Sequence, residues 1–326
     1  ITIGDLFMSY QAHIKDTEYK FNLTDHISIL DAAISQGINL PYGCRNGDCG
    51  GCRCNVSSGI LLDNDGNTIE SLNDVLLCQS FANSDIVLDI PGFDNSIKTR
   101  NYLAKIIKLD KHHNTIIMQI QIPNTQSFNH LPGQFIEISA AGVTRSYSIA
   151  NIANDSKIIE LHIRHYPKGF FSSKVWNDYK VGGVVKFKAP LGSFTLQNTQ
   201  KPLLMVCTGT GFAPINSLLL HMLQIKSTRS IHLIWGNYEE DDFYCLDYLE
   251  QYKELNLKLS LCANKVQDAT KFSSLLVTQV VTSQYNDLSN YEVYACGNPN
   301  MINDIKNLTI KELNLDKNNF FCDSFS

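Results

Sequence analysis

The sequence of 326 residues predicts three successive domains of different fold class: α+β, then all-β, then α/β. Strand patterns surround one helical segment in residues 5–90, and short alternating runs separated by turn residues fill 100–198. From residue 202 onwards, strand and helix patterns alternate. We therefore place the domains at 1–92, 93–198 and 199–326, with 93–99 as a short linker.

In the first domain, residues 28–36 are the helical segment, because Ser28 can cap its start and Gly37 can end it. Residues 53–62 and 85–90 have strand patterns. Pro91-Gly92 then breaks the pattern, which favours a domain boundary at this point.

In the second domain, apolar and polar residues alternate in short runs, which is typical of a small antiparallel barrel or sandwich. These runs are 102–109, 115–122, 134–139, 158–165 and 184–189. The one helical candidate is 171–179.

In the third domain, apolar strand runs alternate with helical patterns, so we expect parallel strands joined by crossover helices. The strand runs are 203–207, 231–235, 258–262 and 292–296. The helical patterns are 213–224, 246–254 and 272–282.

Composition favours an ordinary globular protein, with 44% hydrophobic and 18% charged residues. No apolar run approaches the roughly 18 residues of a membrane span, so we expect a cytoplasmic protein that does not interact with membranes. Net charge is −8 over residues 1–92, +7 over 93–198 and −4 over 199–326. Acidic segments flank the basic one, which argues against a nucleic-acid partner. The sign reversal predicts attraction between the first two domains, unless the charges only confer solubility.

Five of the ten cysteines lie between Cys44 and Cys78. Cys44, Cys49 and Cys52 have C-x4-C-x2-C spacing, and Cys78 follows 26 residues after Cys52. This spacing predicts a plant-type [2Fe–2S] cluster, for which the glycines of the loop let backbone N–H groups turn towards the sulfurs. The alternative, a zinc site, usually takes two paired ligand knuckles. We expect Cys54 to be an ordinary buried thiol.

The run from Ile29 to Cys52 resembles the ferredoxin-like domain that is fused to bacterial NADH-dependent electron-transfer reductases. The resemblance implies a β-grasp fold for residues 1–92.

The segment Arg145-Ser-Tyr147-Ser148, preceded by Pro132-Gly-Gln-Phe135, resembles the ferredoxin–NADP reductase superfamily. The resemblance implies that Arg145 pairs with a flavin pyrophosphate, that Tyr147 stacks on the isoalloxazine, and that Ser148 hydrogen-bonds near its hydride-accepting nitrogen. A second phosphate loop is implied at Gly169, Phe170, Phe171 and Ser172, and the two segments together favour FAD over FMN. By itself, the first segment fits equally a strand with a tyrosine in the core.

A glycine-rich turn follows the first strand of the third domain and opens a helix, a context that predicts a phosphate cradle. Its expected binding residues are Thr208, Gly209, Thr210, Gly211 and Pro214. The turn matches the superfamily's G-T-G-x-A-P signature rather than the six-residue Rossmann fingerprint.

A second signature begins at Cys296, where C-G-x-P-x-M ends a strand and adds Gly297 and Asn298 to the cofactor-binding set. The resemblance implies that Cys296 lies beside the nicotinamide, whereas the alternative is a simple buried thiol. The C-terminal tail resembles the superfamily's aromatic-x-acid-x-Phe ending, which implies that Asp323 lies near Cys296 and Ser148 and that Phe325 shields the flavin. A tail packed only for stability is the alternative. Relatives often have Arg where this chain has Tyr238.

These sites in series predict an NAD(P)H-dependent iron–sulfur flavoprotein oxidoreductase, with NADH, FAD and the cluster acting in that order. We expect a monomer that serves a one-electron acceptor protein. The domain order is shared by oxygenase reductases of the phenol and benzoate type and by the reductase of CDP-6-deoxyhexose synthesis, which serves a dehydrase. Residues 40–47 and the Asp323-Ser-Phe325 tail look most like the latter. The alternatives are an oxygenase reductase, a self-sufficient NADH:flavin or ferric reductase, and a non-enzymatic iron–sulfur scaffold, against which the two cofactor signatures argue.

Overall fold

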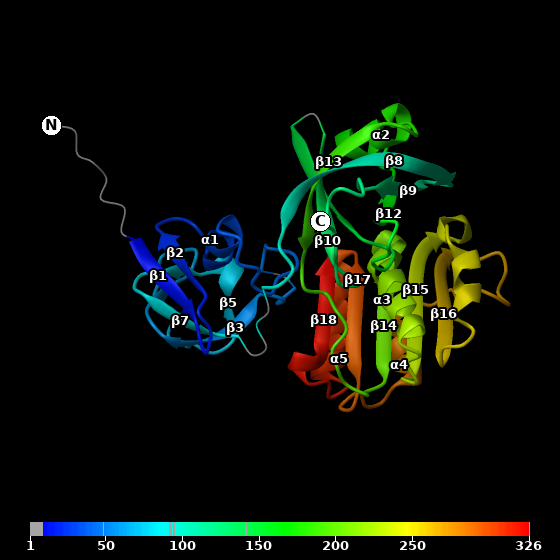
Figure 1. Ribbon diagram of the computed structural model, residues 1–326. Helices are drawn as coiled ribbons and strands as arrows, with labels where there is room; N and C mark the ends of the chain where they lie inside the picture. Colours follow the sequence, from blue (N-terminus) through cyan, green and yellow to red (C-terminus); the bar gives the residue numbers. More distant parts are fainter. Residues whose placement is uncertain (1–8, 48, 91–92, 94, 141, 326) are drawn as a thin grey trace. The chain divides into compact units, whose positions relative to one another are not determined.

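The computed structural model describes residues 9–47, 49–90, 93, 95–140 and 142–325, so the break predicted at Pro91-Gly92 lies outside the described residues. The chain divides into two compact units, Ile1–Thr99 and Arg100–Ser326. The second unit contains both the antiparallel and the parallel sheet (Figure 1). The boundaries at 92/93 and 198/199 stay predictions.

The first unit is a mixed sheet, in strand order β2-β1-β7-β3-β5, together with one α-helix and a small β4-β6 ribbon. Its elements are β1 (Ser9–Ile14), β2 (Lys20–Thr24), α1 (Ile29–Ser35), β3 (Arg53–Ser58), β4 (Leu61–Leu62), β5 (Val75–Leu76), η1 (Leu77–Gln79), β6 (Phe81–Ala82) and β7 (Ile86–Asp89). Helix α1 begins where predicted, because Ser28 Oγ accepts a hydrogen bond from Asp31 N at 3.1 Å. Gly37 follows the helix at φ +75°, a conformation that glycine adopts without strain. The predicted α+β class is confirmed.

The antiparallel sheet of the second unit has six strands in the order β11-β10-β13-β8-β9-β12. Its elements are β8 (Arg100–His112), β9 (Thr115–Gln121), β10 (Phe135–Ala140), β11 (Val143–Ser148), β12 (Ile158–Arg164), α2 (Phe170–Asp178) and β13 (Val184–Leu191). Alternate residues of β8, among them Tyr102, Ala104 and Ile106, point into one apolar core, as the sequence alternation predicts. Strand β11 was not among the predicted strands, because its first four residues are largely exposed.

The parallel sheet has five strands in the order β16-β15-β14-β17-β18. Its strands are β14 (Leu203–Thr208), β15 (Ile231–Glu239), β16 (Leu257–Lys265), β17 (Glu292–Gly297) and β18 (Phe320–Ser324). The α-helices are α3 (Phe212–Gln224), α4 (Val277–Gln284) and α5 (Pro299–Lys311), and the 3-10 helices are η2 (Gly209–Gly211), η3 (Glu240–Asp242), η4 (Leu246–Tyr252) and η5 (Lys317–Asn319). Strands β14 and β17 are buried almost throughout, as expected where both faces of a parallel sheet are covered.

Four elements of this sheet differ from the sequence prediction. Residues 246–252 form a 3-10 helix rather than an α-helix. Of these residues only Tyr252 is fully buried, so the segment has no continuous buried apolar stripe. The helix predicted at 272–282 begins only at Val277, because Ser273 first pairs with the end of β16. Helix α5 and strand β18 were not predicted.

The strand order changes direction between β14 and β17, which is the topological switch point of the sheet. In open parallel sheets, ligands bind beyond the carboxyl ends of the strands at this point. The glycine-rich turn after β14 and the segment after β17 therefore meet where a ligand is expected. No helix within the described residues is both long and apolar enough to cross a membrane.

Candidate active site

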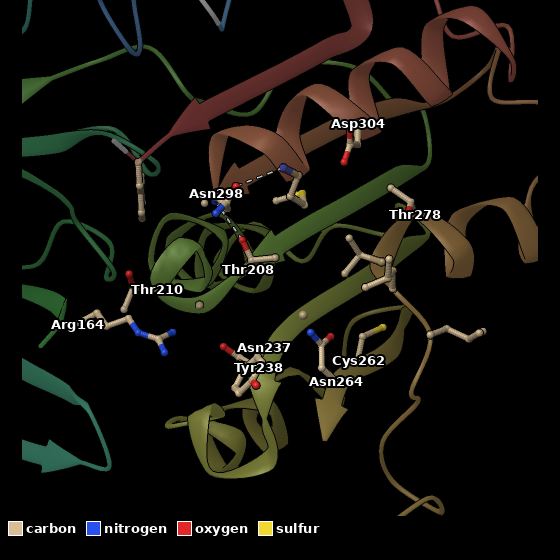
Figure 2. Close-up of a pocket in the computed structure, with 18 of the residues that line it drawn as sticks. Arg164, Thr208, Thr210, Asn237, Tyr238, Cys262, Asn264, Thr278, Asn298 and Asp304 are labelled. Atoms are coloured by element: carbon tan, nitrogen blue, oxygen red, sulfur yellow. Dashed lines mark hydrogen bonds between the residues drawn. The ribbon is translucent and has the colours of Figure 1, made fainter. Parts of the chain in front are cut away.

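A cavity of about 420 Å³ opens at the switch point. The segments that line it come from the ends of β12, β14, β15, β16 and β17, the starts of α4 and α5, and the C-terminal tail. Figure 2 shows Arg164 and Thr210 on one side of the opening and Asn264, Thr278 and Asp304 on the other. Both predicted nicotinamide signatures thus contribute to one cavity.

The two signatures pack against each other through glycine. A Cβ on Gly211 would lie 2.4 Å from the carbonyl oxygen of Cys296, and one on Gly297 would lie 2.5 Å from Thr208 Oγ1. Both distances are too short for any side chain, so these positions require glycine. The hydroxyl of Thr208 also accepts a hydrogen bond from Asn298 N at 3.0 Å, which joins the two turns directly (Figure 2).

Two helices of 13 residues begin at this junction. Helix α5 is capped by Asn298, whose Oδ1 accepts from Asn300 N at 2.8 Å. Helix α3 continues directly from η2, because Phe212 N donates to the carbonyls of Gly209 and Thr210. The exposed start of this combined helix is therefore η2, which follows Thr208, has no side-chain cap and contains no acidic residue. The N–H groups of an uncapped first turn, with the positive end of the helix dipole, favour an anion such as a phosphate.

Ser148, Cys296 and Asp323 come together from three strands. Ser148 Oγ donates to Asp323 Oδ2 at 3.2 Å, and Cys296 stands beside Asp323 in the pairing of β17 with β18. All three residues are buried. Burial, followed by the charge of Asp323, raises the pKa of Cys296 well above its usual value, so the thiol stays protonated at neutral pH. The C-terminal tail is thus a strand of the sheet, and its backbone continues the pairing as Phe325 N donates to Gly297 O at 2.9 Å.

The predicted flavin segment lies on β11 and at the start of α2. Tyr147 is half-buried, with its ring 5.6 Å from that of Phe171, whereas Arg145 is exposed and donates to Thr144 O at 2.8 Å. Gly169 precedes the first turn of α2, and Phe170 is 59% exposed beside it. The hydroxyl of Ser172 bonds to Tyr166 N and O within its own loop, and its expected contact with a pyrophosphate through the backbone N–H stays a prediction.

The four predicted ligand cysteines lie close together in the first unit as two pairs. Cys44 N and Cys49 N each donate to the sulfur of the other residue at 3.2 Å, and the sulfurs of Cys52 and Cys78 are 3.2 Å apart. Gly51 N also donates to Cys49 Sγ at 3.3 Å. Among the residues described, no three His, Cys, Asp or Glu side chains are grouped around a single metal-ion position.

The surroundings of the cysteines in the first unit shift their pKa values in different directions. A hydrogen bond from Cys52 lowers the pKa of Cys78, whereas hydrogen bonding with Cys49 and then burial raise that of Cys44. Cys54 lies on β3, outside both pairs, and burial raises its pKa to about 12. Cys54 is thus half-buried rather than fully buried as expected, and its raised pKa makes it an unreactive thiol.

Family profiles match all three parts of the chain. The 2Fe-2S iron-sulfur cluster binding domain matches residues 12–83, the oxidoreductase FAD-binding domain matches 105–196, and the oxidoreductase NAD-binding domain matches 205–307. The chain is 32% identical to the CDP-6-deoxy-L-threo-D-glycero-4-hexulose-3-dehydrase reductase of Yersinia pestis, over 91% of this chain and 93% of that one. It belongs to the three-domain [2Fe–2S]/FAD/NAD reductases.

The reductase is also 30% identical to reductase component 1 of terephthalate 1,2-dioxygenase from Comamonas, over 98% of both chains. A cytochrome P450 reductase of Amycolatopsis shares its fold with a TM-score of 0.78 at 20% identity, over 97% of this chain and 98% of that one. The order of domains expected from the sequence, cluster then FAD then NAD, is thereby confirmed.

The residues of the reductase fit these cofactors. Two cysteine pairs suit a two-iron cluster, in which each iron takes two thiolates, better than one tetrahedral zinc. The uncapped turn η2, which leads into α3, suits the pyrophosphate of a dinucleotide. The exposed guanidinium of Arg145 and the first turn of α2 offer a cation and free N–H groups to a second pyrophosphate, that of FAD.

The sequence analysis did not indicate that Arg164 and Asp242 contact each other beside the cavity. Arg164 ends β12 and lines the cavity, and its Nη2 lies 3.3 Å from Asp242 Oδ1. The Asp242 side chain is 2% exposed and also accepts from Asn114 Nδ2 at 2.7 Å. The sequence offers one indication of the contact between Arg164 and Asp242. Arg164 stands at the end of an alternating strand, shortly before the predicted phosphate loop at Gly169.

A further cavity residue that the sequence did not indicate is Asn237. Both polar atoms of its amide are buried and, within the described part of the chain, have no hydrogen-bond partner. A buried amide normally has partners, so Asn237 is a candidate for a polar contact to a bound nucleotide.

Proposed function

We propose that this reductase oxidises NADH at the switch-point cavity and delivers the electrons singly, through the cysteine loop, to a partner protein. The observation that carries the proposal is the meeting of Ser148, Cys296 and Asp323 next to the dinucleotide cavity. FAD accepts a hydride and a [2Fe–2S] cluster carries one electron at a time, and both supply this chemistry when bound.

The protein's own contribution to hydride transfer is orientation and exclusion of water. Ser148 holds a hydroxyl at the flavin-side strand, Asp323 fixes that hydroxyl, and Cys296 presents a neutral thiol on the nicotinamide side. Phe325 lines the cavity and supplies an apolar face that a nicotinamide ring displaces. These residues would act mainly in the transition state, by orienting the bound cofactors and keeping water out of the site.

Binding is assigned to two groups of residues. For NADH, they are Thr208, Gly209, Thr210, Gly211, Pro214, Gly297 and Asn298, which form the turns at the start of α3 and α5. For FAD, they are Arg145, Tyr147, Ser148, Gly169, Phe170, Phe171 and Ser172. Cys44, Cys49, Cys52 and Cys78 hold the cluster.

For the partner we propose a CDP-6-deoxyhexose dehydrase. The support is the 32% identity to the dehydrase reductase over nearly the whole of both chains, together with the cluster loop at residues 40–47 and the Asp323-Ser-Phe325 tail. The second candidate is an oxygenase component, favoured by the 30% identity to the terephthalate dioxygenase reductase over 98% of both chains.

The experiment is an acceptor comparison at fixed NADH. NADH consumption is measured with the dehydrase and its CDP-6-deoxy-4-hexulose substrate, with a terephthalate-type oxygenase component, and with free flavin or ferric iron. The proposal predicts consumption that depends on both dehydrase and sugar nucleotide. Faster turnover with the oxygenase component would favour the second candidate, and equal turnover on free flavin would favour a self-sufficient reductase.

A further inference from the structure

The fourth cysteine of the cluster loop has a side-chain neighbour that is not itself a ligand. Gln79 follows Cys78 in η1, and its Nε2 lies 3.0 Å from Cys78 O and 3.9 Å from Cys78 Sγ. Gly47 N also donates to the same sulfur. The sulfur of Cys78 thus receives one backbone and one side-chain N–H in addition to its contact with Cys52.

The carboxamide of Gln79 is held from both sides. Asn64 Nδ2 donates to Gln79 Oε1 at 2.5 Å, which fixes the oxygen away from the sulfur and turns Nε2 towards it. On the other side Gly47 has φ +93°, and a Cβ there would lie 3.1 Å from Gln79 Cγ. The glycine of the ligand loop therefore leaves room for this side chain, and Asn64 determines which end of the amide faces the ligand.

We propose that Gln79, oriented by Asn64, sets the reduction potential of the cluster through an N–H directed at the Cys78 sulfur. The proposal rests on the assignment of Cys78 as a cluster ligand. Gln79 is a positioning and tuning residue rather than a catalytic one, because it acts through the sulfur of its neighbour.

The direction of the effect follows from charge. Reduction adds one negative charge that is shared with the ligand sulfurs, and an N–H donor stabilises the more negative state. Removal of the donor must therefore lower the potential, and a carboxylate in its place must lower it further. Loss of one such bond makes reduction about tenfold less favourable, which is a shift of about 59 mV for one electron.

The test is an anaerobic redox titration of the full-length holoprotein, followed by the paramagnetic signal of the reduced cluster. The variants are Gln79→Leu, Gln79→Glu and Asn64→Ala, with Gln11→Leu as the matched control, since Gln11 is exposed on β1 of the same unit. We expect the potential to fall for Gln79→Leu, to fall further for Gln79→Glu, and to fall by less for Asn64→Ala, with the control unchanged.

Asn64→Ala keeps Gln79 and every ligand, so it tests the proposal even if the Gln79 variants fail to assemble a cluster. Normal signals with unchanged potentials in all variants would overturn the role of Gln79 and leave the proposed function intact. A wild-type protein without a [2Fe–2S] signal would instead refute the proposed ligand set itself.

Discussion

Ser148, Cys296 and Asp323 are 175 or fewer residues apart in the chain and meet at one point because three strand ends converge there. The resemblance of the C-terminal tail implied that Asp323 lies near Cys296 and Ser148, and the pairing of β17 with β18 supplies the geometry that the sequence could not. Strand β18 has only five residues, three apolar ones followed by Asp323 and Ser324, and so short a segment has no periodicity that separates a strand from a packed end, which is why β18 was not predicted.

Cys296→Ala should slow flavin reduction by NADH by about tenfold or more, because a contact to the reacting rings is lost from the transition state. Cluster content and FAD content should stay at wild-type levels. Stopped-flow absorbance of the flavin is the measurement.

Cys207→Ala is the matched control, because Cys207 is an equally buried thiol that stands opposite Cys296 on β14. It should cost some stability and leave the rate unchanged. The raised pKa of Cys296 also predicts the pH dependence of flavin reduction. Because the thiol stays neutral throughout the pH range in which a free cysteine ionises, its ionisation should not change the wild-type rate between pH 7 and about 9. A wild-type rate in Cys296→Ala would remove this residue from the mechanism.

The basic residues near the nucleotide also predict cofactor choice. Arg229 is buried in an ion pair with Glu292, with Nη2 and Oε2 2.6 Å apart, and does not line the cavity. Lys265 lies 3.4 Å from Glu239 and 4.6 Å from the ring of Tyr238. Arg229 is therefore unavailable to a 2′-phosphate, and Lys265 is an ammonium rather than the guanidinium fork that holds such a phosphate best. The guanidinium that does line the cavity, that of Arg164, already contacts the buried carboxylate of Asp242 at 3.3 Å.

We therefore expect NADH to exceed NADPH in kcat/KM by at least about tenfold. Steady-state rates with both nucleotides at low concentration give this ratio. Comparable values would mean that Lys265 leaves Glu239 when NADPH binds, and the assignment would fail.

Secondary-structure elements were predictable where periodicity is strong and local. The strand-turn-helix of β14, η2 and α3 follows from an apolar run, two glycines and a long apolar helix. The start of helix α5 is also indicated by the sequence, because Asn298 is a typical N-cap residue and Pro299 follows it at the first helical position. The link between Asp242 and the barrel could not be predicted, since it joins residues 128 positions apart.

The contacts of Asp242 with Asn114 and Arg164 should contribute to the free energy of unfolding and to the affinity for NADH. Asp242→Ala leaves the Asn114 amide and the Arg164 guanidinium without their common acceptor, which should lower the free energy of unfolding by about 2 kcal/mol. It should also raise the KM for NADH more than it lowers kcat, because Arg164 lines the cavity.

Asp241→Ala is the control, since Asp241 is the exposed neighbour of Asp242 in η3. Denaturant unfolding and NADH kinetics should be unchanged in it. If both variants behave alike, the buried carboxylate does not hold Arg164 in place.

On the scale of the whole molecule, the proposed function assigns the contact with the electron acceptor to the acidic first domain, which has a net charge of −8. Exposed charges act over about 8–10 Å at physiological salt and steer encounters more than they tighten complexes. We expect the acceptor to present a basic surface, and the second-order rate of electron transfer from the reduced reductase to fall as salt rises. Stopped-flow oxidation across an ionic-strength series measures this, and a rate that ignores salt would leave solubility as the role of these charges.

In the proposed function, electrons from NADH leave the protein through the loop that contains Cys44, Cys49, Cys52 and Cys78. The measurement that tests it most directly is anaerobic NADH reduction of the wild type and of Cys78→Ser and Cys54→Ser, followed by flavin absorbance and paramagnetic resonance. We predict flavin reduction in all three, a rhombic [2Fe–2S] signal in the wild type and Cys54→Ser, and neither signal nor reduction of a one-electron acceptor protein in Cys78→Ser. A wild-type protein that contains zinc, or a Cys78→Ser variant that reduces the acceptor at the wild-type rate, would contradict the account.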